Sequence, residues 1–297
     1  MLEQGSSIAL GNFDGVHLGH QQVISAAVKN AGVYTPAIYT FEVNSKGAKC
    51  ITSIKDRSKL FSDLGIRQCV FDDFKDVKDI CASKFITDIL IGRLNAKLVF
   101  CGEDFRFGKD AKGDTLMLKE YGDKLGFKVN IIPILEIDGQ KISSSNIRAY
   151  IQAGDMERVT KNLGRHFSLT SEIIHGKGMG HTFGVPTINQ KLNPHMAAPK
   201  FGVYATRIKL GDNIYDAVTN IGVRPSVKDS KIPNIETFVF GYKNDVYGLT
   251  TTVYFYKMIR DERKFDSLDL LYKAIQADID TAKSYFAKDK NFGDINE

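Results

Sequence analysis

Apolar and polar residues follow two different rhythms in the two halves of the chain. In the first half, short apolar runs typical of strands alternate with segments whose apolar residues recur at helical spacing. The predicted strands are 6–13, 35–41, 66–74, 96–102 and 127–137, and the predicted helices are 20–30, 56–65, 76–95 and 113–126. This alternation predicts an α/β unit with a parallel sheet and helices on both of its faces.

The second half consists mainly of β-branched and aromatic runs separated by turns. They predict strands at 168–176, 201–211, 213–222, 235–242 and 249–259. This spacing favours an all-β unit, a small antiparallel barrel or sandwich, and an amphipathic pattern over 267–286 adds a C-terminal helix. The character changes near 154–165, so we predict two domains, 1–158 and 159–297.

Composition narrows the class of function. The chain has 297 residues with 40 Lys+Arg and 35 Asp+Glu, a net charge of +5. Residues 1–160 hold 21 basic and 20 acidic side chains (+1) and residues 161–297 hold 19 and 15 (+4). Such a mild charge argues against a nucleic-acid binder and is compatible with small anionic substrates.

Two further features bear on the compartment. The four cysteines include no C-x-x-C pair, which argues against a zinc site and for a reducing environment. We expect no signal peptide at the start, and no apolar run reaches the roughly 18 residues of a membrane-spanning helix. These patterns predict a cytoplasmic protein with no membrane partner.

Three polar stretches follow predicted strands and point to a phosphate site. They are GNFDGVHLGH at 11–20, CGEDFRFGKD at 101–110 and KISSSNIR at 141–148. His17 and His20 would lie at a helix N-terminus, which attracts anions, and Arg148 offers a forked guanidinium to phosphates. Each stretch alone has a structural explanation: a packed histidine pair, a helix cap, a surface ion pair. Their coincidence at strand ends favours the functional interpretation.

A second candidate site lies in HGKGMGHTFGVPTIN, residues 175–189. Gly176, Gly178 and Gly180 form a loop whose N–H groups can wrap phosphates, although no G-K-[ST] follows and a Walker loop is therefore excluded. Thr187 and Asn189 supply two neutral oxygen ligands on one face of an extended segment. Mg²⁺ uses few protein ligands and fills its shell with phosphate oxygens and water.

The motifs G-x-F-D-G-x-H-x-G-H, G-x-D-F-R-F-G and I-S-S-x-x-I-R resemble the adenylyltransferase module of the prokaryotic bifunctional riboflavin kinase/FAD synthetases. That resemblance implies a Rossmann-like nucleotidyltransferase domain that uses ATP to convert FMN to FAD. His17, His20 and Arg148 would bind the transition state and the triphosphate. The resemblance also implies a nucleotide pocket, made of Gly11, Asn12, Phe13, Asp14, Gly15, Ser144 and Ser145, and a flavin side, made of Asp104, Phe105 and Arg106.

The second half resembles riboflavin kinase through its P-T-x-N segment, through FGVYA and through TNIGVRPS. The resemblance implies a barrel domain that phosphorylates riboflavin to FMN, with Mg²⁺ at Thr187 and Asn189. Glu236 matches the catalytic base of that family. The implied partners are riboflavin, FMN and ATP, with neither nucleic acid nor membrane, and the implied assembly is a monomer or weak homo-oligomer.

The match departs from the family pattern after Phe41, where EVNSKGAK replaces a proline–histidine–proline stretch. Because that stretch would position FMN, a riboflavin kinase with a degenerate adenylyltransferase module is one alternative. A non-catalytic flavin-binding regulatory protein is another. HLGH with KISSS is also similar to the signature pair of class I aminoacyl-tRNA synthetases, but the charge offers no tRNA-binding surface.

Overall fold

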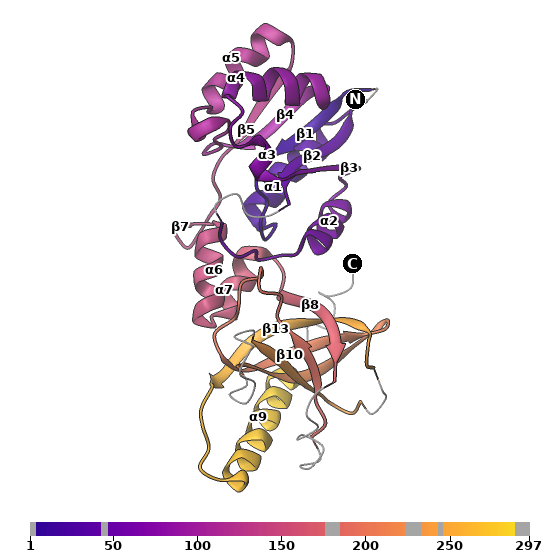
Figure 1. The fold of residues 1–297 in the computed structure, drawn as a ribbon, viewed down its shortest axis with the longest axis vertical. Helices are drawn as coiled ribbons and strands as arrows, with labels where there is room; N and C mark the ends of the chain where they lie inside the picture. The colour runs from indigo at the N-terminus through magenta and orange to yellow at the C-terminus, as the bar shows by residue number, and fades with distance from the viewer. Residues whose placement is uncertain (1–3, 43–46, 176–184, 224–232, 243–245, 289–297) are drawn as a thin grey trace. The chain divides into compact units, whose positions relative to one another are not determined.

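The computed structural model describes residues 4–42, 47–175, 185–223, 233–242 and 246–288. The chain divides into two compact units, Met1–Ser144 and Ser145–Glu297. Figure 1 shows the first unit in indigo to magenta and the second in pink to yellow. The predicted assignment of one activity to 1–158 and the other to 159–297 stays a prediction.

The first unit is built on a five-stranded parallel sheet in the order β3-β2-β1-β4-β5. The strands are β1 (Ser6–Leu10), β2 (Thr35–Phe41), β3 (Gln68–Asp72), β4 (Ala96–Gly102) and β5 (Lys128–Ile132). The main connecting helices are α1 (Leu18–Lys29), α2 (Ile54–Asp63) and α5 (Thr115–Leu125). The winding reverses between β1 and β4, and such a point is where ligands bind in open parallel sheets.

Helices cover both faces of this sheet. Successive side chains of each strand point to opposite faces, so each strand contributes to two core clusters. Ile8 and Leu10 of β1 face one core cluster, which includes residues from α5 and from the helical segment around Phe85. Ala9, between them, faces the other cluster with residues from α1 and α2. The prediction of a parallel sheet buried on both sides is confirmed.

Two segments of this unit differ from the prediction. The expected helix over 76–95 is instead α3 (Phe74–Val77), then α4 (Ala82–Lys84) running into a wider π-helical segment, η1 (Phe85–Arg93). The helix is interrupted before Cys81 because the Ile80 carbonyl accepts a hydrogen bond from the backbone N–H of Lys109 at 2.7 Å, a residue remote in sequence. β5 ends before Pro133, and a small hairpin, β6 (Glu136–Ile137) with β7 (Gln140–Lys141), follows it.

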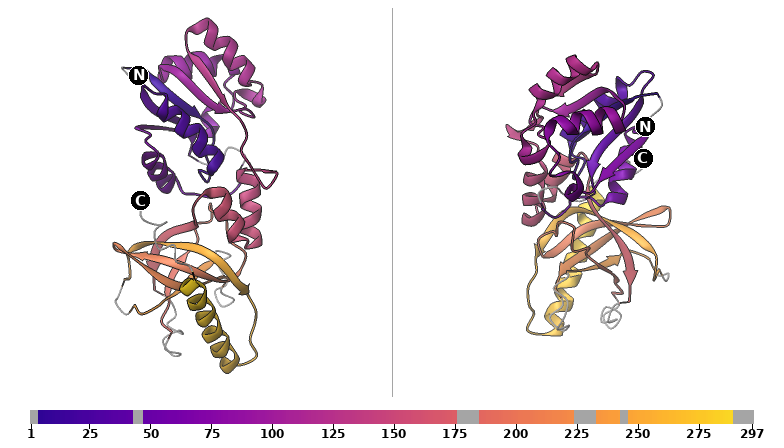
Figure 2. Two further views of the ribbon diagram at one scale, coloured as in Figure 1. Left: turned by 180° about the vertical axis from the view of Figure 1, so that it is seen from behind. Right: turned by 45° about the horizontal axis from the view of Figure 1, so that its top comes forward.

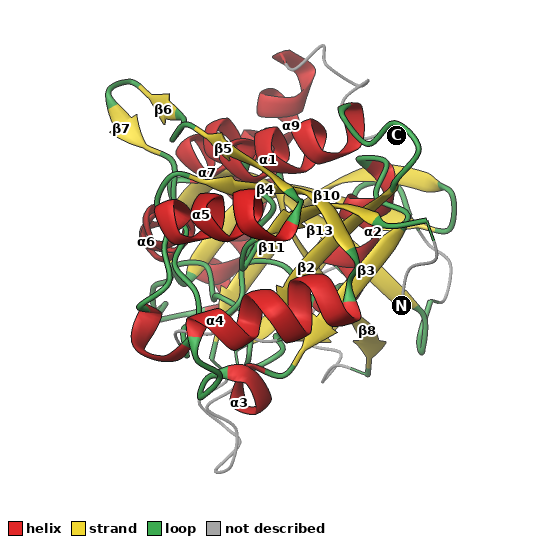
Figure 3. Ribbon diagram, turned by 90° about the horizontal axis from the view of Figure 1, so that it is seen from above, coloured by secondary structure: helices red, strands yellow, loops and turns green. Residues whose placement is uncertain are grey.

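The second unit is a closed antiparallel barrel in the order β10-β11-β12-β9-β8-β13. Its strands are β8 (Phe167–Ile174), β9 (Ile188–Lys191), β10 (Gly202–Leu210), β11 (Asn213–Gly222), β12 (Asn234–Val239) and β13 (Thr250–Asp261). Two helices, α6 (Ser144–Ala153) and α7 (Met156–Leu163), precede the barrel, and α9 (Leu268–Lys288) follows it. Figure 3 colours the strands of the chain yellow and its helices red. The barrel alternative and the C-terminal helix are thereby confirmed.

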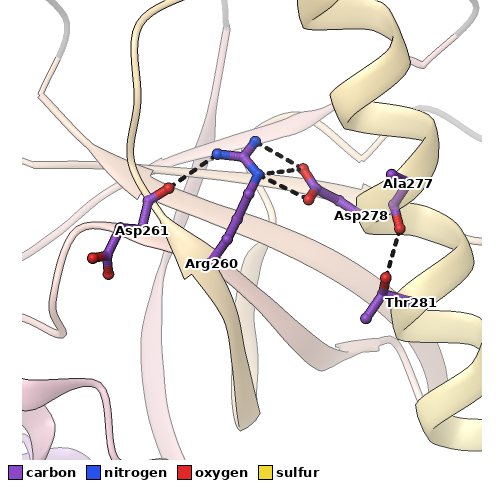
Figure 4. Close-up of polar contacts among 5 residues, drawn as sticks. All are labelled: Arg260, Asp261, Ala277, Asp278 and Thr281. Carbon is purple, nitrogen blue, oxygen red and sulfur yellow. Dashed lines mark hydrogen bonds and ion pairs between the residues drawn. The ribbon is translucent and has the colours of Figure 1, made fainter.

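The interior of the barrel contains a chain of hydroxyl groups as well as apolar side chains. Thr206 and Thr237 both lie within hydrogen-bond distance of Thr219, at 2.7 and 2.9 Å between hydroxyl oxygens, and all three side chains are fully buried. Outside the barrel, α9 lies along the strands, as the left view of Figure 2 shows in yellow. Arg260 of β13 joins α9 through Asp278 (Figure 4).

Candidate active sites

The loop between β1 and α1 has an unusual backbone. Phe13 and Val16 have positive φ angles of 46° and 43°, and Gly15 has a φ of 83°. A positive φ is uncommon for any non-glycine residue and a true outlier for a β-branched one such as Val16. Such conformations concentrate at ligand-binding sites, where the surrounding structure holds them in place.

The two predicted histidines lie together at the start of α1. The backbone N–H of His20 donates to Nδ1 of His17 at 3.2 Å, so His17 caps the helix. Their rings stack with centroids 3.5 Å apart. Because Nδ1 of His17 accepts this hydrogen bond, the proton of the neutral ring must be on Nε2. The cap therefore sets the tautomer in which Nε2 is a donor.

The other residues predicted around this loop have different surroundings. Gly11 leaves room for the Phe13 ring, which a side chain at that position would meet at 2.9 Å. Oδ1 of Asn12 is buried and has no hydrogen-bond partner among the described residues. Buried acceptors without a hydrogen-bond partner are rare, so Oδ1 of Asn12 is suited to accept a hydrogen bond from a bound nucleotide. Asp14 instead points inward and accepts the Ile51 amide at 2.8 Å.

Two contacts brace the loop from elsewhere in the first unit. The Ser144 hydroxyl donates to the carbonyl of Asp14 at 2.8 Å, so the predicted serine lies against the predicted loop. Arg57 of α2, only 1% exposed, donates to the carbonyls of Asn12 and Phe41 at 3.3 and 3.0 Å. Burial lowers the pKa of Arg57, partly offset by the Asp14 charge. Nothing in the sequence alone marks Arg57, because its partners are main-chain atoms.

The residues predicted for the flavin side follow β4. Asp104 and Arg106 do not pair with each other: Asp104 pairs with Lys141 at 2.6 Å and Arg106 with Asp114 at 3.1 Å. Phe105 stacks on the neighbouring Phe107 with centroids 5.7 Å apart. These aromatic rings continue into a chain of edge and tilted contacts through Phe85, Tyr39, Phe41 and Phe74.

Ser145 and Arg148 belong to the second unit, on α6. The Arg148 guanidinium lies 3.5 Å from the Ser145 hydroxyl, one turn earlier on the same helix. The structure thus brings Arg148 to Ser145, and it does not determine the distance from Arg148 to the histidines of the first unit. Gly176, Gly178 and Gly180 of the predicted phosphate loop lie outside the described residues.

The kinase candidates of the second unit come together through strand pairing. Glu236 of β12 is directly opposite Asn189 of β9 in the antiparallel ladder. Nδ2 of Asn189 donates to the main-chain carbonyl of Thr187 at 3.1 Å, which turns its Oδ1 the other way. Residues that are far apart in sequence therefore present oxygen atoms on one face of the barrel wall.

Asn234 is a site residue that the sequence did not reveal. It lies two positions before Glu236, on the same face of β12. Its Nδ2 donates to Oε1 of Glu236 at 2.7 Å and to Oδ1 of Asn189 at 3.3 Å. A period of two from Glu236 was the available signal, but its meaning depends on β9, a short strand that the sequence pattern missed.

Comparisons with known proteins identify relatives of both units. Residues 1–146 match the family described as FAD synthetase, and residues 163–286 match the family described as riboflavin kinase. A bifunctional riboflavin kinase/FMN adenylyltransferase of Buchnera aphidicola subsp. Schizaphis graminum is 35% identical, over 96% of this chain and 95% of its own length. The protein of that name from Bacillus subtilis is also 35% identical, over 96% and 94%.

A solved structure has the same fold. A crystal structure of a protein from Streptococcus pneumoniae described as a macrolide-efflux protein has a TM-score of 0.85 and 30% identity, and the match covers 94% of each chain. The description as a macrolide-efflux protein belongs to the Streptococcus pneumoniae protein and is not carried over to this chain. In the part of this chain that the structure describes, no helix is long and apolar enough to cross a membrane.

Proposed function

The chain belongs to the family of bifunctional riboflavin kinase/FMN adenylyltransferases, and we propose which of its residues carry each reaction. The enzyme phosphorylates riboflavin to FMN with ATP, and it adenylates FMN to FAD with a second ATP and releases pyrophosphate. We assign the kinase to the barrel and adenylyl transfer to the parallel sheet. The observation that carries the kinase assignment is the pairing of Glu236 with Asn189 across two strands.

In adenylyl transfer, an oxygen of the FMN phosphate attacks the α-phosphorus of ATP while the bond to the leaving pyrophosphate breaks. Charge builds on the phosphoryl oxygens during this step. Nε2–H of His17, with the tautomer set by the helix cap, donates to these oxygens together with His20. One well-placed donor of this kind is worth about 3 kcal/mol, roughly a hundredfold in rate. Arg148 binds the outer phosphates.

The nucleotide and the flavin have distinct surroundings in this proposal. Gly11, Gly15, Phe13, Ser144 and Ser145 line the nucleotide with Asn12, whose buried Oδ1 accepts from the base or ribose. Asp14 supports the pocket indirectly, because its carboxylate accepts the Ile51 amide and so holds the loop in place. The aromatic rings around Phe105 offer a stacking surface for the isoalloxazine, and Asp104 and Arg106 border it.

In riboflavin phosphorylation, Glu236 takes the proton of the ribityl hydroxyl as its oxygen attacks the γ-phosphorus and ADP leaves. Thr187 and Asn189 would hold Mg²⁺, and their neutral oxygens beside a carboxylate suit its preference for few protein ligands. The Asn189 amide is held by its donation to the main-chain carbonyl of Thr187, so Oδ1 is the atom that it would offer to the ion. Bound Mg²⁺ would offset the charge of the ATP phosphates. The role of the glycine loop at 176–180 in binding those phosphates stays a prediction from the sequence, since the loop lies outside the described residues.

The test of the assignment is a product analysis. With riboflavin, ATP and Mg²⁺, the purified protein should give FMN and then FAD, resolved by chromatography. FMN without FAD would mean a kinase with an inactive first unit. No conversion of riboflavin would refute the enzyme assignment.

Two variants separate the activities. Glu236→Gln should abolish FMN formation and leave FAD synthesis from supplied FMN. Replacement of His17 and His20 by alanine should do the reverse. Equal loss of both activities in either variant would refute the division between the units.

The remaining features of the proposal concern assembly and compartment. We propose a cytoplasmic monomer or weak homo-oligomer that binds neither nucleic acid nor membrane. The mild net charge of +5 supports the last point, because a chain of this charge is not expected to be strongly attracted to nucleic acids or to anionic membranes. Sedimentation of the purified protein with and without its substrates would test the oligomeric state.

A further inference from the structure

The strand that carries Asn189 is short for the barrel that it belongs to. β9 has four residues, against six to twelve in the other strands of the barrel. In the described part of the chain, its ladder with β8 consists of two residue pairs. Each main-chain hydrogen bond contributes little on its own, so a ladder of this length holds Asn189 weakly.

Gln190, the residue after Asn189, strengthens the attachment of β9 from inside the barrel. We propose that Gln190 is a positioning residue for the kinase: its buried amide fixes β9 and so holds Asn189 where it can bind Mg²⁺ together with ATP. The proposal rests on the proposed function, in which Thr187 and Asn189 hold the ion.

The Gln190 side chain points away from Asn189, into the barrel, because successive residues of a strand point to opposite faces. Gln190 is directly opposite Ile235 of β12 and Ile173 of β8, which are 1% and 2% exposed. Gln190 itself is 0% exposed. It therefore acts through the strand and not by contact with a substrate.

The amide of Gln190 joins three strands. Its Nε2 donates to the carbonyl of Ser171 at 2.8 Å and to the carbonyl of Thr251 at 3.1 Å. Both partners are acceptors, so the orientation of the amide is defined: Oε1 in the place of Nε2 would face two oxygens. Ser171 of β8 and Thr251 of β13 are ladder partners, so one side chain ties β9 to its neighbour and to the strand beyond. The Thr251 hydroxyl donates to the Lys209 carbonyl, which extends the connection to β10.

An amide is unfavourable at this position if only the stability of the barrel matters. Oε1 of Gln190 is buried and has no hydrogen-bond partner among the described residues. An unpaired buried acceptor costs free energy, and an apolar side chain of the same length would suit the isoleucines on either side. Departures from the most stable choice are expected at functional sites. The position of β9 therefore explains the amide better than stability does.

Gln190→Met in the full-length enzyme tests the proposal. Methionine has a similar length and volume but no amide, so both hydrogen bonds are lost with little change in shape. The Mg²⁺ concentration for half-maximal riboflavin phosphorylation should rise about tenfold, the lower end of the effect seen when the support of a metal ligand is removed. FAD synthesis from supplied FMN should match the wild type, because Gln190 lies outside the first unit.

Hydrogen exchange measured by mass spectrometry gives a second readout, without turnover. In the wild type, ADP with Mg²⁺ should slow the exchange of amides at 187–192 more than ADP alone. In Gln190→Met, the same slowing should need about tenfold more Mg²⁺.

The matched control is Thr206→Val. It also removes a buried polar contact inside the barrel, the one with the Thr219 hydroxyl, but from β10, which carries none of the predicted ligands. Thr206→Val should lower the melting temperature and leave the Mg²⁺ requirement unchanged.

A higher Mg²⁺ requirement in Gln190→Met and not in Thr206→Val, in both readouts, supports the proposal. An unchanged requirement in Gln190→Met overturns it, whatever happens to the melting temperature. An equal rise in Thr206→Val also overturns it, because general loosening of the barrel would then be the cause. If Gln190→Met does not fold, Gln190→Asn gives the same comparison, since its shorter amide cannot reach both carbonyls.

Asn189→Ala separates this inference from the proposed function. A normal Mg²⁺ requirement in Asn189→Ala would refute the proposed ligand itself. A raised requirement in Asn189→Ala with a normal one in Gln190→Met overturns only the role of Gln190.

Discussion

The ion pair between Arg260 and Asp278 should be the main polar anchor of α9 on the barrel, and Asp278→Asn tests it. Nε of Arg260 donates to both carboxylate oxygens of Asp278 at 2.9 and 3.2 Å, and Nη2 donates at 2.8 Å (Figure 4). Asp278 is 8% exposed and Arg260 22%. An asparagine keeps the shape, but its amide group would face the guanidinium with donor against donor.

The size of the effect follows from burial. Removing one partner of a fully buried pair destabilises a protein by about 3–5 kcal/mol. Because Arg260 keeps some contact with water, we expect a loss of about 2–3 kcal/mol. For a unit of 145–297 this is equivalent to a fall in Tm of about 5–10 °C. The second unit should lose this stability, while the first unit keeps its own.

Hydrogen exchange measured by mass spectrometry reads the two units separately, so it is the appropriate assay. Amides of β13 and α9 should exchange faster in Asp278→Asn, and amides of β1 and β4 should not change. Asp261→Asn removes an exposed charge and should alter stability by less than about 0.5 kcal/mol. The double variant Arg260→Met/Asp278→Leu should be milder than Asp278→Asn. A double variant as unstable as the single one would refute the argument that an unpaired buried charge is the cause.

Two further predictions concern the first unit. Arg57→Met should lower FAD synthesis from FMN at least tenfold and leave riboflavin phosphorylation within twofold, because the carbonyls of Asn12 and Phe41 lose their donor; an equal fall in both rates would contradict this. Burial and the charge of Asp104 raise the pKa of the Cys101 thiol from 9.0 to about 12. Above pH 9 the unfolded chain binds fewer protons than the folded one, so the free energy of unfolding should fall, by about 1.4 kcal/mol at pH 10. Urea unfolding at pH 7 and pH 10 should show a loss in the wild type that is about 1.4 kcal/mol smaller in Cys101→Ala; the loss that remains comes from groups such as Tyr39, Tyr204 and Cys69, whose pKa values burial also raises.

Local patterns were sufficient for much of the fold. The ranges of β2, β4 and β11 agree with the sequence prediction to the residue, because each strand is a clear apolar or β-branched run between turn residues. Helical structure continues only over 82–93 of the helix predicted at 76–95, because the deciding contact, from Lys109 to Ile80, comes from a distant loop. The short β9 was missed because four residues carry too little pattern to separate a strand from a loop.

The candidate sites divide in a similar way. Residues whose chemistry is visible in a motif, such as His17 and Glu236, were identified from the sequence alone. Asn234 and Arg57 were not, because each acts through hydrogen bonds that exist only once separate segments have paired or packed. The roles of the motif residues stay predictions until the variants above are measured.

The row of threonine hydroxyls inside the barrel protects the chain from a misaligned β12. If this strand slipped by one residue, the Glu236 carboxylate would turn into the dry interior and Thr237 would leave its place beside Thr219. An uncompensated charge in such surroundings is expensive, and the abandoned hydroxyl adds to the penalty. Only the alignment that puts Glu236 outside keeps the Thr237 hydroxyl within hydrogen-bond distance of Thr219, so the buried threonines favour the native register of β12 as the barrel closes.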